Sequence, residues 1–421
     1  MDGSEHTVIA LLMAQAGRLV GRKKPFGSKV GKYAPKSRKK EASSLVGLSC
    51  GSKEVEKPEK NTGRQERPGR LLLIFGKTSN RIPASQAAEE SSKNLNRMNK
   101  TASNVRGAFL GLALGDALGV PVEFNAPSEM ADKPLTGMIG YGTHHQPPGT
   151  WSDDSSLTFC LAESLLQGYD LWDMADRFVR WHQEAYWSAR GEVFDIGCIT
   201  KESLIQWKEI LDTGDVGLLE EWYAFEDDQQ NGNGSLMRVL PLLFHIKGMP
   251  IGEQFELIWQ VSMLTHRHVR AAICCLLYLR VAERLWEGLD KSAAYQQARA
   301  DVSDNWDAIG LPAGERSHLA KLIDGDISSL GADEIESGEY VIPTLEATLW
   351  AFLRHDRYDE AVLAGINLGY DTDTVGTLIG GLAGLHAGED ALPADWVAQL
   401  ARQDDIRDLA DRLAAHYGIP A

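Results

Sequence analysis

In Gly369-Tyr370-Asp371-Thr372-Asp373-Thr374-Val375-Gly376, two aspartates one residue apart are each followed by a threonine, and a run of small apolar residues continues to His386. The aspartates stand where a helix would begin, and backbone N–H groups and the helix dipole favour negative charge there. Capping a helix needs only one such residue. Two aspartates also suit a hard divalent cation bound through oxygen, such as Mg²⁺, Mn²⁺ or Ca²⁺. Both interpretations are open on this stretch alone.

A second acidic cluster lies upstream, in Gly149-Thr150-Trp151-Ser152-Asp153-Asp154-Ser155-Ser156. The segment that follows, Leu157–Leu166, has helical periodicity, and Gly168 marks its end. Taken singly, this cluster is explained as well by a doubled N-cap as by cation binding. Two such clusters in one chain favour cation binding.

Glycines recur every four residues in two segments, one near each end of the region that follows residue 97. They are Gly107, Gly111, Gly115 and Gly119 in the predicted helix Asn104–Val120, and Gly376, Gly380, Gly384 and Gly388 after the aspartates. Each glycine costs an isolated helix on the order of 1 kcal/mol relative to alanine. The pattern therefore predicts that the two helices pack closely against each other, so that residues 98–421 close into one domain.

Helical periodicity continues along the chain, and no segment alternates as a strand does. Further helices are predicted over Leu171–Tyr186, Ile196–Leu211, Leu236–Phe244, Ala293–Asn305, Gly314–Ile323, Thr344–Arg354 and Tyr358–Leu368. The stretch Phe255–Leu285 carries the segment Ser262–His268 and then an apolar helix, and Leu392–Tyr417 adds one or two helices. The Gly- and Pro-rich segment Pro127–Gly149 is predicted to be a loop. Ser103 or Asn104 is expected to cap the first helix, whose Asp116 would be costly to bury without a partner. The prediction is an all-α fold, a compact orthogonal helical domain.

Charge divides the chain into two parts. Residues 1–97 hold 20 Lys and Arg against 9 Asp and Glu, a net charge of +11. The remainder holds 23 basic and 50 acidic residues, a net charge of −27. Because phosphate contacts need a positive surface, this acidic body is not expected to bind nucleic acid.

The basic segment, residues 1–97, has no Trp and only two short apolar runs, so it cannot build its own core and is expected to be a largely disordered N-terminal arm. Three accounts of it are open. It could be a partner-binding arm whose basic face meets an acidic surface. It could be a targeting segment, or it could precede a true start at Met98.

The five cysteines form neither a CxxC pair nor a disulfide framework, and four fall in apolar or helical segments, as buried thiols of a reduced cytoplasm would. No apolar run approaches the roughly 18 residues of a membrane span. The first apolar run, Val8–Val20, lacks a basic region before it, which argues against a secretory signal. A cytoplasmic protein without a membrane partner is expected.

The turn Asn231-Gly232-Asn233-Gly234-Ser235 could offer backbone N–H groups to a phosphate, although an ordinary turn is the default interpretation. His266 and His268 lie two residues apart, so on a helix they would face different directions and could not bind one metal together. Neither feature identifies a site by itself.

Five motifs occur in an order that resembles the ADP-ribosylglycohydrolases, the family of dinitrogenase-reductase-activating glycohydrolase. They are Gly-Leu-Ala-Leu-Gly-Asp-Ala-Leu-Gly with Glu123 after it, Gly-Thr-Trp-Ser-Asp-Asp-Ser, Gly-Asn-Gly-Ser-Leu-Met-Arg, Thr-His-Arg-His, and Gly-Tyr-Asp-Thr-Asp-Thr-Val-Gly-Thr-Leu-Ile-Gly-Gly-Leu-Ala-Gly. The resemblance runs from about residue 101 to the C-terminus and leaves the arm unmatched. Five ordered motifs make it specific.

The resemblance implies an all-helical domain with a cleft that binds ADP-ribose around two Mg²⁺ or Mn²⁺ ions. The implied metal ligands are Ser152, Asp153, Asp154, Asp371, Asp373 and Thr374. Glu123 matches an acidic residue at the edge of the metal centre. The ribose- and phosphate-lining residues would be Asn233, Gly234, Ser235 and Met237, with His266 near the nucleotide. The family often has threonine where this chain has Ser152, a change that keeps the hydroxyl.

The implied reaction is hydrolysis of the bond between ADP-ribose and an acceptor, such as an arginine side chain of an ADP-ribosylated protein. The catalytic base would be Asp153 or Asp154, with Glu123 as the third choice. The sequence does not separate a metal ligand from a base, because both roles need the same side chain. Loops such as Pro127–Gly149 and Val216–Asn231 would select the acceptor, but they carry no readable pattern.

Two alternative functions do not depend on catalysis. The chain could be an immunity or regulatory protein whose arm blocks an ADP-ribosyltransferase, with or without hydrolysis. It could also be a non-enzymatic relative, such as a crystallin-like protein, although both intact aspartate pairs argue against that.

Overall fold

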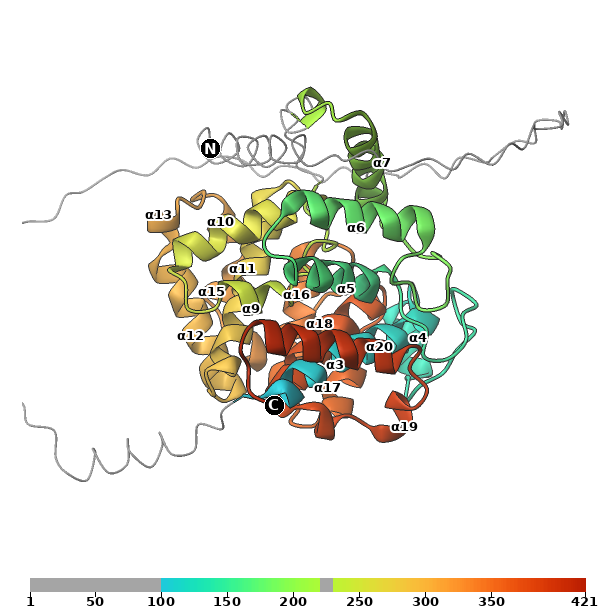
Figure 1. The fold of residues 1–421 in the computed structure, drawn as a ribbon. Coiled ribbons are helices and arrows are strands. Elements are labelled where there is room, and N and C mark those ends of the chain that lie inside the picture. Colours follow the sequence, from blue (N-terminus) through green and yellow to red (C-terminus); the bar gives the residue numbers. More distant parts are fainter. Residues whose placement is uncertain (1–99, 220–229) are drawn as a thin grey trace, which may run out of the picture. The chain divides into compact units, whose positions relative to one another are not determined.

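The computed structural model describes residues 100–219 and 230–421, coloured by sequence in Figure 1. The predictions for the N-terminal arm, residues 1–97, lie outside the described residues, as does part of the segment Val216–Asn231. The boundary after residue 97 therefore stays a prediction.

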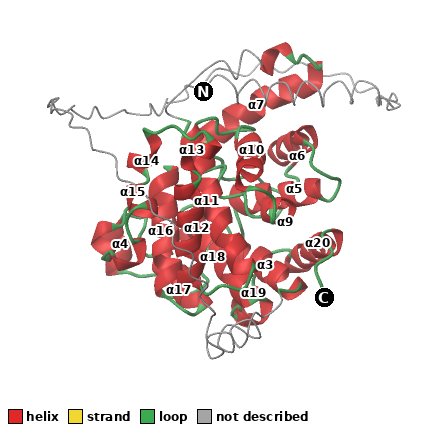
Figure 2. Cartoon of the chain, turned by 90° about the vertical axis from the view of Figure 1, so that its left-hand side faces the viewer, coloured by secondary structure: helices red, strands yellow, loops and turns green. Residues whose placement is uncertain are grey.

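The described residues form α-helices and short 3₁₀ helices joined by loops (Figure 2). In chain order they are α3 Ala102–Gly119, η1 Val120–Val122, α4 Pro127–Asp132, α5 Asp153–Leu165, α6 Leu171–Glu184, α7 Cys198–Thr213, α9 Leu242–Ile246, α10 Ile251–Ser262, α11 Val269–Trp286, α12 Lys291–Asp304, α13 Trp306–Ile309, α14 Glu315–His318, α15 Ala320–Ile323, η2 Ile327–Ser329, η3 Ala332–Glu334, α16 Val341–Arg354, α17 Tyr358–Ile366, α18 Thr372–Ala387, η4 Glu389–Ala391, α19 Ala394–Val397 and α20 Gln403–His416. Within this part of the chain, β-type pairing is limited to an isolated bridge between Gly232 and Tyr340. The all-α prediction is confirmed.

The two glycine-ridged helices, α3 and α18, lie side by side at the centre of the domain (Figures 1 and 2). A Cβ atom added at Gly115 would lie 1.9 Å from the carbonyl oxygen of Gly376. The same close approach pairs Gly380 with Gly111, at 2.2 Å, and Gly384 with Gly107, at 1.9 Å. Rising numbers on one helix meet falling numbers on the other, so the pair is antiparallel. The predicted packing of the two ridges is confirmed.

Other helices surround this central pair. Helices α11, α16 and α17 pack against α18, while α5 and α20 pack against α3. Tyr358 donates a hydrogen bond of 2.6 Å from its hydroxyl to the carbonyl of Gly111, and Tyr278 donates one of 3.0 Å to that of Leu378. The backbone at the contact is therefore shielded from water while its remaining polar groups are satisfied.

Several predicted boundaries were wrong, each for a local physical reason. Thr101, not Ser103 or Asn104, caps α3, in a capping box with Asn104. The predicted loop Pro127–Gly149 begins with α4, where Pro127 stands at the first helical turn and favours a helix start. Of Leu236–Phe244, only the part after Pro241 is helical, because proline disfavours helical geometry in the residue before it.

Within the stretch Phe255–Leu285, the predicted apolar helix after His268 is α11, and the segment before the break is α10. His268 caps α11 by accepting a hydrogen bond from the backbone N–H of Arg270. Met263 and Leu264, in the break, are buried like the helices on either side. The apolar pattern therefore continues through the break, and periodicity could not reveal it.

The statement that no apolar run approaches a membrane span was wrong for α3 with η1. The segment Ala102–Val122 is long and apolar enough by composition to cross a membrane, and it is almost wholly buried inside the domain, as a core helix is. Among the cysteines, Cys160, Cys274 and Cys275 are buried free thiols, as expected, whereas Cys198 at the start of α7 is exposed.

Candidate active site

The contact between α3 and α18 brings Glu123 beside the acidic start of α18. At Gly119, a Cβ atom would lie 2.3 Å from the Cα atom of Asp373, so the end of α3 touches the first turn of α18. The hydroxyl of Thr372 donates a 2.9 Å hydrogen bond to the Gly119 carbonyl. One carboxylate oxygen from each of Glu123, Asp371 and Asp373 lies within 4.8 Å of the others.

The start of α5 is fixed by Asp116, the acidic residue of the apolar helix α3. Its buried carboxylate accepts hydrogen bonds from the backbone N–H groups of Ser152, at 2.9 Å, and Ser155, at 3.0 Å, and from the Ser155 hydroxyl, at 2.6 Å. These are N–H groups that a helix start leaves without a partner. Burial nevertheless raises the pKa of Asp116 to about 7.

Each acidic cluster uses one side chain as a cap and leaves other oxygens free. Ser152 caps α5 by accepting a hydrogen bond from the Asp154 N–H, and Asp371 caps α18 by accepting one from the Thr374 N–H. Oδ1 of Asp154 and Oδ2 of Asp373 are buried and have no hydrogen-bond partner among the described residues. Capping therefore explains only part of each cluster.

The clustered carboxylates repel one another in a buried setting. Burial and the charges of neighbouring carboxylates raise the pKa values of Asp153, Asp154 and Asp373 well above their usual range. Burial, followed by the charge of Asp195, raises the pKa of Glu123 to about 11. Hard divalent cations prefer oxygen ligands and offset this repulsion. The free oxygens and the donor set both fit such a cation.

The turn that contains Asn233 lies directly beside the second acidic cluster. The Asn233 side-chain amide donates hydrogen bonds to the carboxylate of Asp371, at 2.5 Å, and to the Thr344 hydroxyl, at 2.9 Å. Its backbone N–H donates to the carbonyl of Glu339. The turn is thereby tied to α18 and to the segment before α16.

The other residues expected to bind substrate lie on or under this turn. The His266 ring packs against it, because a Cβ atom at Gly234 would lie 2.6 Å from the ring carbon Cε1. The Ser235 hydroxyl accepts a 2.8 Å hydrogen bond from the Ser262 hydroxyl, and Met237 is buried. The Ser235 side chain is thus engaged in packing, which leaves its backbone N–H for a ligand.

The sequence profile of the ADP-ribosylglycohydrolases matches residues 97–420. The chain belongs to the ADP-ribosylglycohydrolase family. It is similar to the ADP-ribosylarginine hydrolase Tri1 of Pseudomonas putida, at 32% identity over 73% of this chain and 77% of the relative. It is also similar to the ADP-ribosyl-[dinitrogen reductase] glycohydrolase of Rhodospirillum rubrum, at 27% identity over 74% of this chain and 96% of the relative.

A solved ADP-ribosylglycohydrolase-related protein complex has a chain that superposes with a TM-score of 0.61 at 31% identity, over 76% of this chain and 100% of that chain. The resemblance read from the five motifs is therefore confirmed. The expectation of an enzyme of the ADP-ribosyl glycohydrolase class is confirmed as well.

In this family member, the structure adds two residues that sequence reasoning missed, His144 and Asp195. The His144 Nε2 atom contacts Glu123, and one oxygen each of Glu123 and Asp195 lies within 4.8 Å of that ring nitrogen. Both residues sit in loops, and neither has a spacing or motif that distinguishes it. Asp195 is half-buried, and its charge raises the pKa of Asp153.

Aromatic side chains surround the acidic centre of this ADP-ribosylglycohydrolase. The His144 ring lies between those of Phe124 and Phe194, with centroid distances of 6.1 and 5.3 Å. Phe124 and Tyr370, each adjacent in sequence to a carboxylate of the centre, are 54% and 48% exposed. These two rings are therefore open to solvent beside the centre rather than packed in the core.

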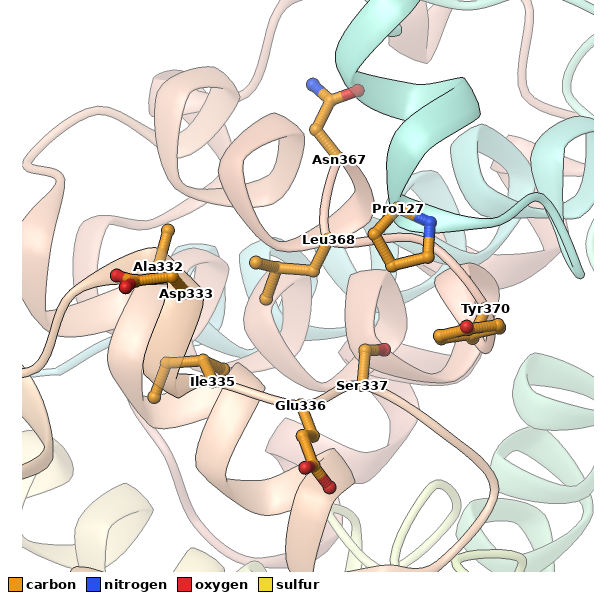
Figure 3. Close-up of a pocket in the computed structure, with 9 residues that line it drawn as sticks. All are labelled: Pro127, Ala332, Asp333, Ile335, Glu336, Ser337, Asn367, Leu368 and Tyr370. Atoms are coloured by element: carbon orange, nitrogen blue, oxygen red, sulfur yellow. The ribbon is translucent and has the colours of Figure 1, made fainter.

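A cavity of about 530 Å³ is lined in part by Tyr370. Figure 3 shows its lining, which comes from the start of α4, from η3 with the segment after it, and from the link between α17 and α18. The residues are Pro127, Ala332, Asp333, Ile335, Glu336, Ser337, Asn367, Leu368 and Tyr370. None of the expected catalytic or metal-binding residues lines it, so it flanks the acidic centre rather than containing it.

Proposed function

We propose that this glycohydrolase removes ADP-ribose from arginine side chains of ADP-ribosylated proteins in a reaction that requires divalent metal ions. The observation that carries the proposal is that Glu123, Asp371 and Asp373 meet in one buried centre, that the charge of Asp154 at the start of α5 is near enough to raise the pKa of Asp373, and that Asp154 and Asp373 keep unpartnered carboxylate oxygens. The arginine acceptor is suggested by relatives named ADP-ribosylarginine hydrolases.

Two Mg²⁺ or Mn²⁺ ions would be held by Ser152, Asp153, Asp154, Asp371, Asp373 and Thr374. When bound, the ions supply Lewis-acid polarisation of the substrate's ribose oxygens and of water. Asp116 acts on this centre from outside, by holding the start of α5, and Asn233 orients the carboxylate of Asp371. Outer partners of this kind fix the direction of the ligand atoms.

In the reaction, a water oxygen forms a bond to the anomeric carbon while the bond from that carbon to the acceptor nitrogen breaks. Asp153 or Asp154 would accept the water proton as the base, and the proton lost there is balanced by one gained on the leaving nitrogen. Glu123 is the third choice, and His144 holds its carboxylate in place.

Two groups of residues at the centre suit the two parts of the substrate. The turn with Asn233, Gly234 and Ser235, together with His266, would contact the ribose and the diphosphate. Beside Glu123, Asp195 and the rings of Phe124 and His144 offer a carboxylate and aromatic faces. A planar guanidinium is attracted to both, through charge and through cation–π contact.

The test is release of ADP-ribose from an arginine-ADP-ribosylated protein, with and without Mg²⁺, by the wild type and Asp371→Ala. We expect metal-dependent release that the variant loses. Full activity after thorough chelation would rule out the metal-dependent mechanism. Bound metal without release would move the question to another acceptor, such as ADP-ribosylserine, which serves as the parallel substrate.

The alternative of an arm that blocks an ADP-ribosyltransferase stays a prediction, since residues 1–97 lie outside the described residues. The opposite charges of the arm and the body motivate it. Deletion of residues 1–97 separates the two functions, because hydrolysis should survive the deletion and arm-dependent inhibition of a transferase should not. We also propose a reducing cytoplasm as the site of action, in keeping with the buried free thiols.

A further inference from the structure

Arg238 carries a guanidinium group that is fully buried, yet no carboxylate contacts it within the described residues. The other buried arginine of the core, Arg280, contacts Glu283 and makes a 2.6 Å ion pair with Asp301. Burying a charge without a counter-ion costs several kcal/mol or more, so such groups are rare unless they have a specific partner. Burial lowers the pKa of Arg238 to about 10, which leaves it charged at neutral pH.

One arm of the Arg238 guanidinium holds the turn beside the acidic centre. Its Nη1 atom donates a hydrogen bond to the carbonyl oxygen of Gly234. That carbonyl shares a trans peptide unit with the N–H of Ser235, and the two point in opposite directions. A cation on the oxygen therefore strengthens the N–H as a donor on the other side of the peptide plane.

The N–H groups of this turn are available for a ligand. Among the described residues, the backbone amides of Gly234 and Ser235 have no hydrogen-bond acceptor, although both residues are buried. Buried amides without partners are uncommon in folded proteins. Consecutive free N–H groups form a concave site for an anion.

The second arm of the guanidinium reaches His266 through Thr265. The Nη2 atom of Arg238 donates a 2.7 Å hydrogen bond to the Thr265 hydroxyl oxygen, which lies 2.8 Å from Nδ1 of His266. Because that oxygen already accepts from Arg238, its own proton is free to be donated to Nδ1. The ring proton then sits on Nε2, the atom that a Cβ at Gly232 would meet at 3.3 Å.

His266 remains neutral in this arrangement. Burial, followed by the charge of Arg238, lowers its pKa to about 3. A neutral ring with its proton on Nε2 is a hydrogen-bond donor toward the turn and cannot be a base at that atom.

We propose that Arg238 is a positioning residue for the diphosphate of the ADP-ribose conjugate: it polarises the free Ser235 amide toward an anion and fixes His266 as an Nε2–H donor beside it. The proposal rests on the proposed function, that ADP-ribose binds at this turn. A diphosphate that binds here is repelled by the clustered carboxylates of the centre. The positive charge of Arg238, hydrogen-bonded to the turn, offsets that repulsion, and Arg238 need not contact the substrate itself.

The first experiment compares the binding of ADP and adenosine to the full chain, with Mg²⁺ present, for the wild type, Arg238→Met and Arg238→Lys. The methionine keeps the volume and removes the charge, whereas the lysine keeps the charge. We expect Arg238→Met to weaken ADP binding about tenfold or more and adenosine binding less than about twofold, since hydrogen bonds to charged groups contribute most when the ligand is charged. Arg238→Lys should recover part of the loss.

Arg280→Met is the matched control, because it removes a buried guanidinium whose ion-pair partners, Glu283 and Asp301, are not residues of the turn. We expect it to lower stability while leaving the ratio of ADP to adenosine affinity unchanged. If Arg238→Met weakens both ligands equally, as a merely structural role would, the proposal is wrong.

The second experiment reads the His266 ring directly, by ¹⁵N chemical shifts of labelled histidine in the wild type, Thr265→Ser and Thr265→Val. We expect the proton on Nε2 in the wild type and in the serine variant. In the valine variant, Nδ1 loses its donor, so a mixture of the two tautomers is expected. An unchanged spectrum in Thr265→Val would overturn the relay from Arg238 to His266.

The outcomes separate this inference from the proposed function. If the wild type binds neither ADP nor ADP-ribose, the proposed function fails and this inference with it. If the wild type binds both and neither arginine variant differs from it, only this inference fails. Should Arg238→Met not fold, Thr265→Val, with a smaller loss of ADP binding in the same direction, decides the question.

Discussion

Helices α5 and α18 both begin with acidic residues that face one centre, and one oxygen-bearing side chain caps each helix, Ser152 in α5 and Asp371 in α18. The two helix starts are anchored in different ways. That of α18 is held by backbone contact with α3, at glycines where no side chain fits. That of α5 is held by the carboxylate of Asp116, which accepts three hydrogen bonds.

The difference shows two physical routes to the same precision. The backbones of α3 and α18 can touch only because glycine has no side chain, so a Cβ atom added at the contact would push the two helices apart. An anchor made of hydrogen bonds can lose one bond and keep the others. Substitutions on the α18 side should therefore act on the fold, and those on the α5 side should act on the site first.

Gly115→Ala should have the largest effect. The added Cβ would lie 1.9 Å from the Gly376 carbonyl oxygen, so α3 and α18 must separate. We expect a loss of about 3 kcal/mol or more in the free energy of unfolding, or an insoluble protein. The control is Gly252→Ala in α10, where nothing lies within 4 Å and a gain of up to about 1 kcal/mol is expected. Equal effects in urea denaturation would contradict the packing argument.

Asp154→Asn and Asp373→Asn should reduce activity most without unfolding the protein. Each residue carries a buried oxygen with no partner, so the amide removes charge from the centre and little else. We expect kcat/KM to fall about 10³-fold, equivalent to about 4 kcal/mol of transition-state stabilisation, with unfolding little changed or improved. Titration with Mn²⁺ should show weakened metal binding in both variants. Wild-type metal affinity would show that these oxygens are not ligands.

Asp116→Asn tests the hydrogen-bonded anchor. The amide keeps one acceptor oxygen but turns an NH₂ group toward donors of Ser152 or Ser155. We expect a loss of about 1 to 3 kcal/mol in stability and of about 10- to 100-fold in activity, as for other residues that orient metal ligands. A loss of stability with full activity would mean that α5 keeps its place without this anchor.

Removal of metal should make stability depend on pH. Burial raises the pKa of Asp371 to about 6 and that of Asp116 to about 7, so between about pH 4 and those values the folded, metal-free protein binds more protons than the unfolded chain. Stability contributed by the protonated groups is therefore present at low pH and lost as the pH rises through 6 and 7. The gap in Tm between Mg²⁺-loaded and chelated protein should widen from pH 5 to pH 8. A Tm difference that does not change with pH would contradict the raised pKa values of Asp371 and Asp116.

His144→Gln should have the smallest effect. Glutamine can still donate to Glu123 but lacks the ring that lies between Phe124 and Phe194. We expect a loss of about three- to tenfold in kcat/KM on the arginine-linked substrate, from a less firmly held carboxylate. We expect the ADP affinity to be unchanged, because the proposed function assigns His144 to the acceptor and not to the nucleotide. A selective loss of ADP binding would place this ring on the nucleotide side instead.

Much of the fold follows from signals within one or two helical turns. The four-residue glycine period in α3 and α18 predicted their contact, and the acidic helix starts predicted both clusters of the centre. Predicted helix boundaries were wrong where the same apolar pattern occurs both in a helix and in the break between two helices. Met263 and Leu264 are buried in a break with the same apolar pattern as the helices around it.

The sequence by itself determined the all-α class, the partner helices, the family and the carboxylates of the two helix starts, because caps, helical periods and ordered motifs depend on neighbours in the chain. Only the tertiary structure decided that His144 and Asp195 meet Glu123, and that Arg238 is buried with no carboxylate partner in the part of the chain that the structure describes. These facts depend on which loops and helices come together after the chain closes, and no local pattern encodes the distance between side chains that the backbone brings into contact.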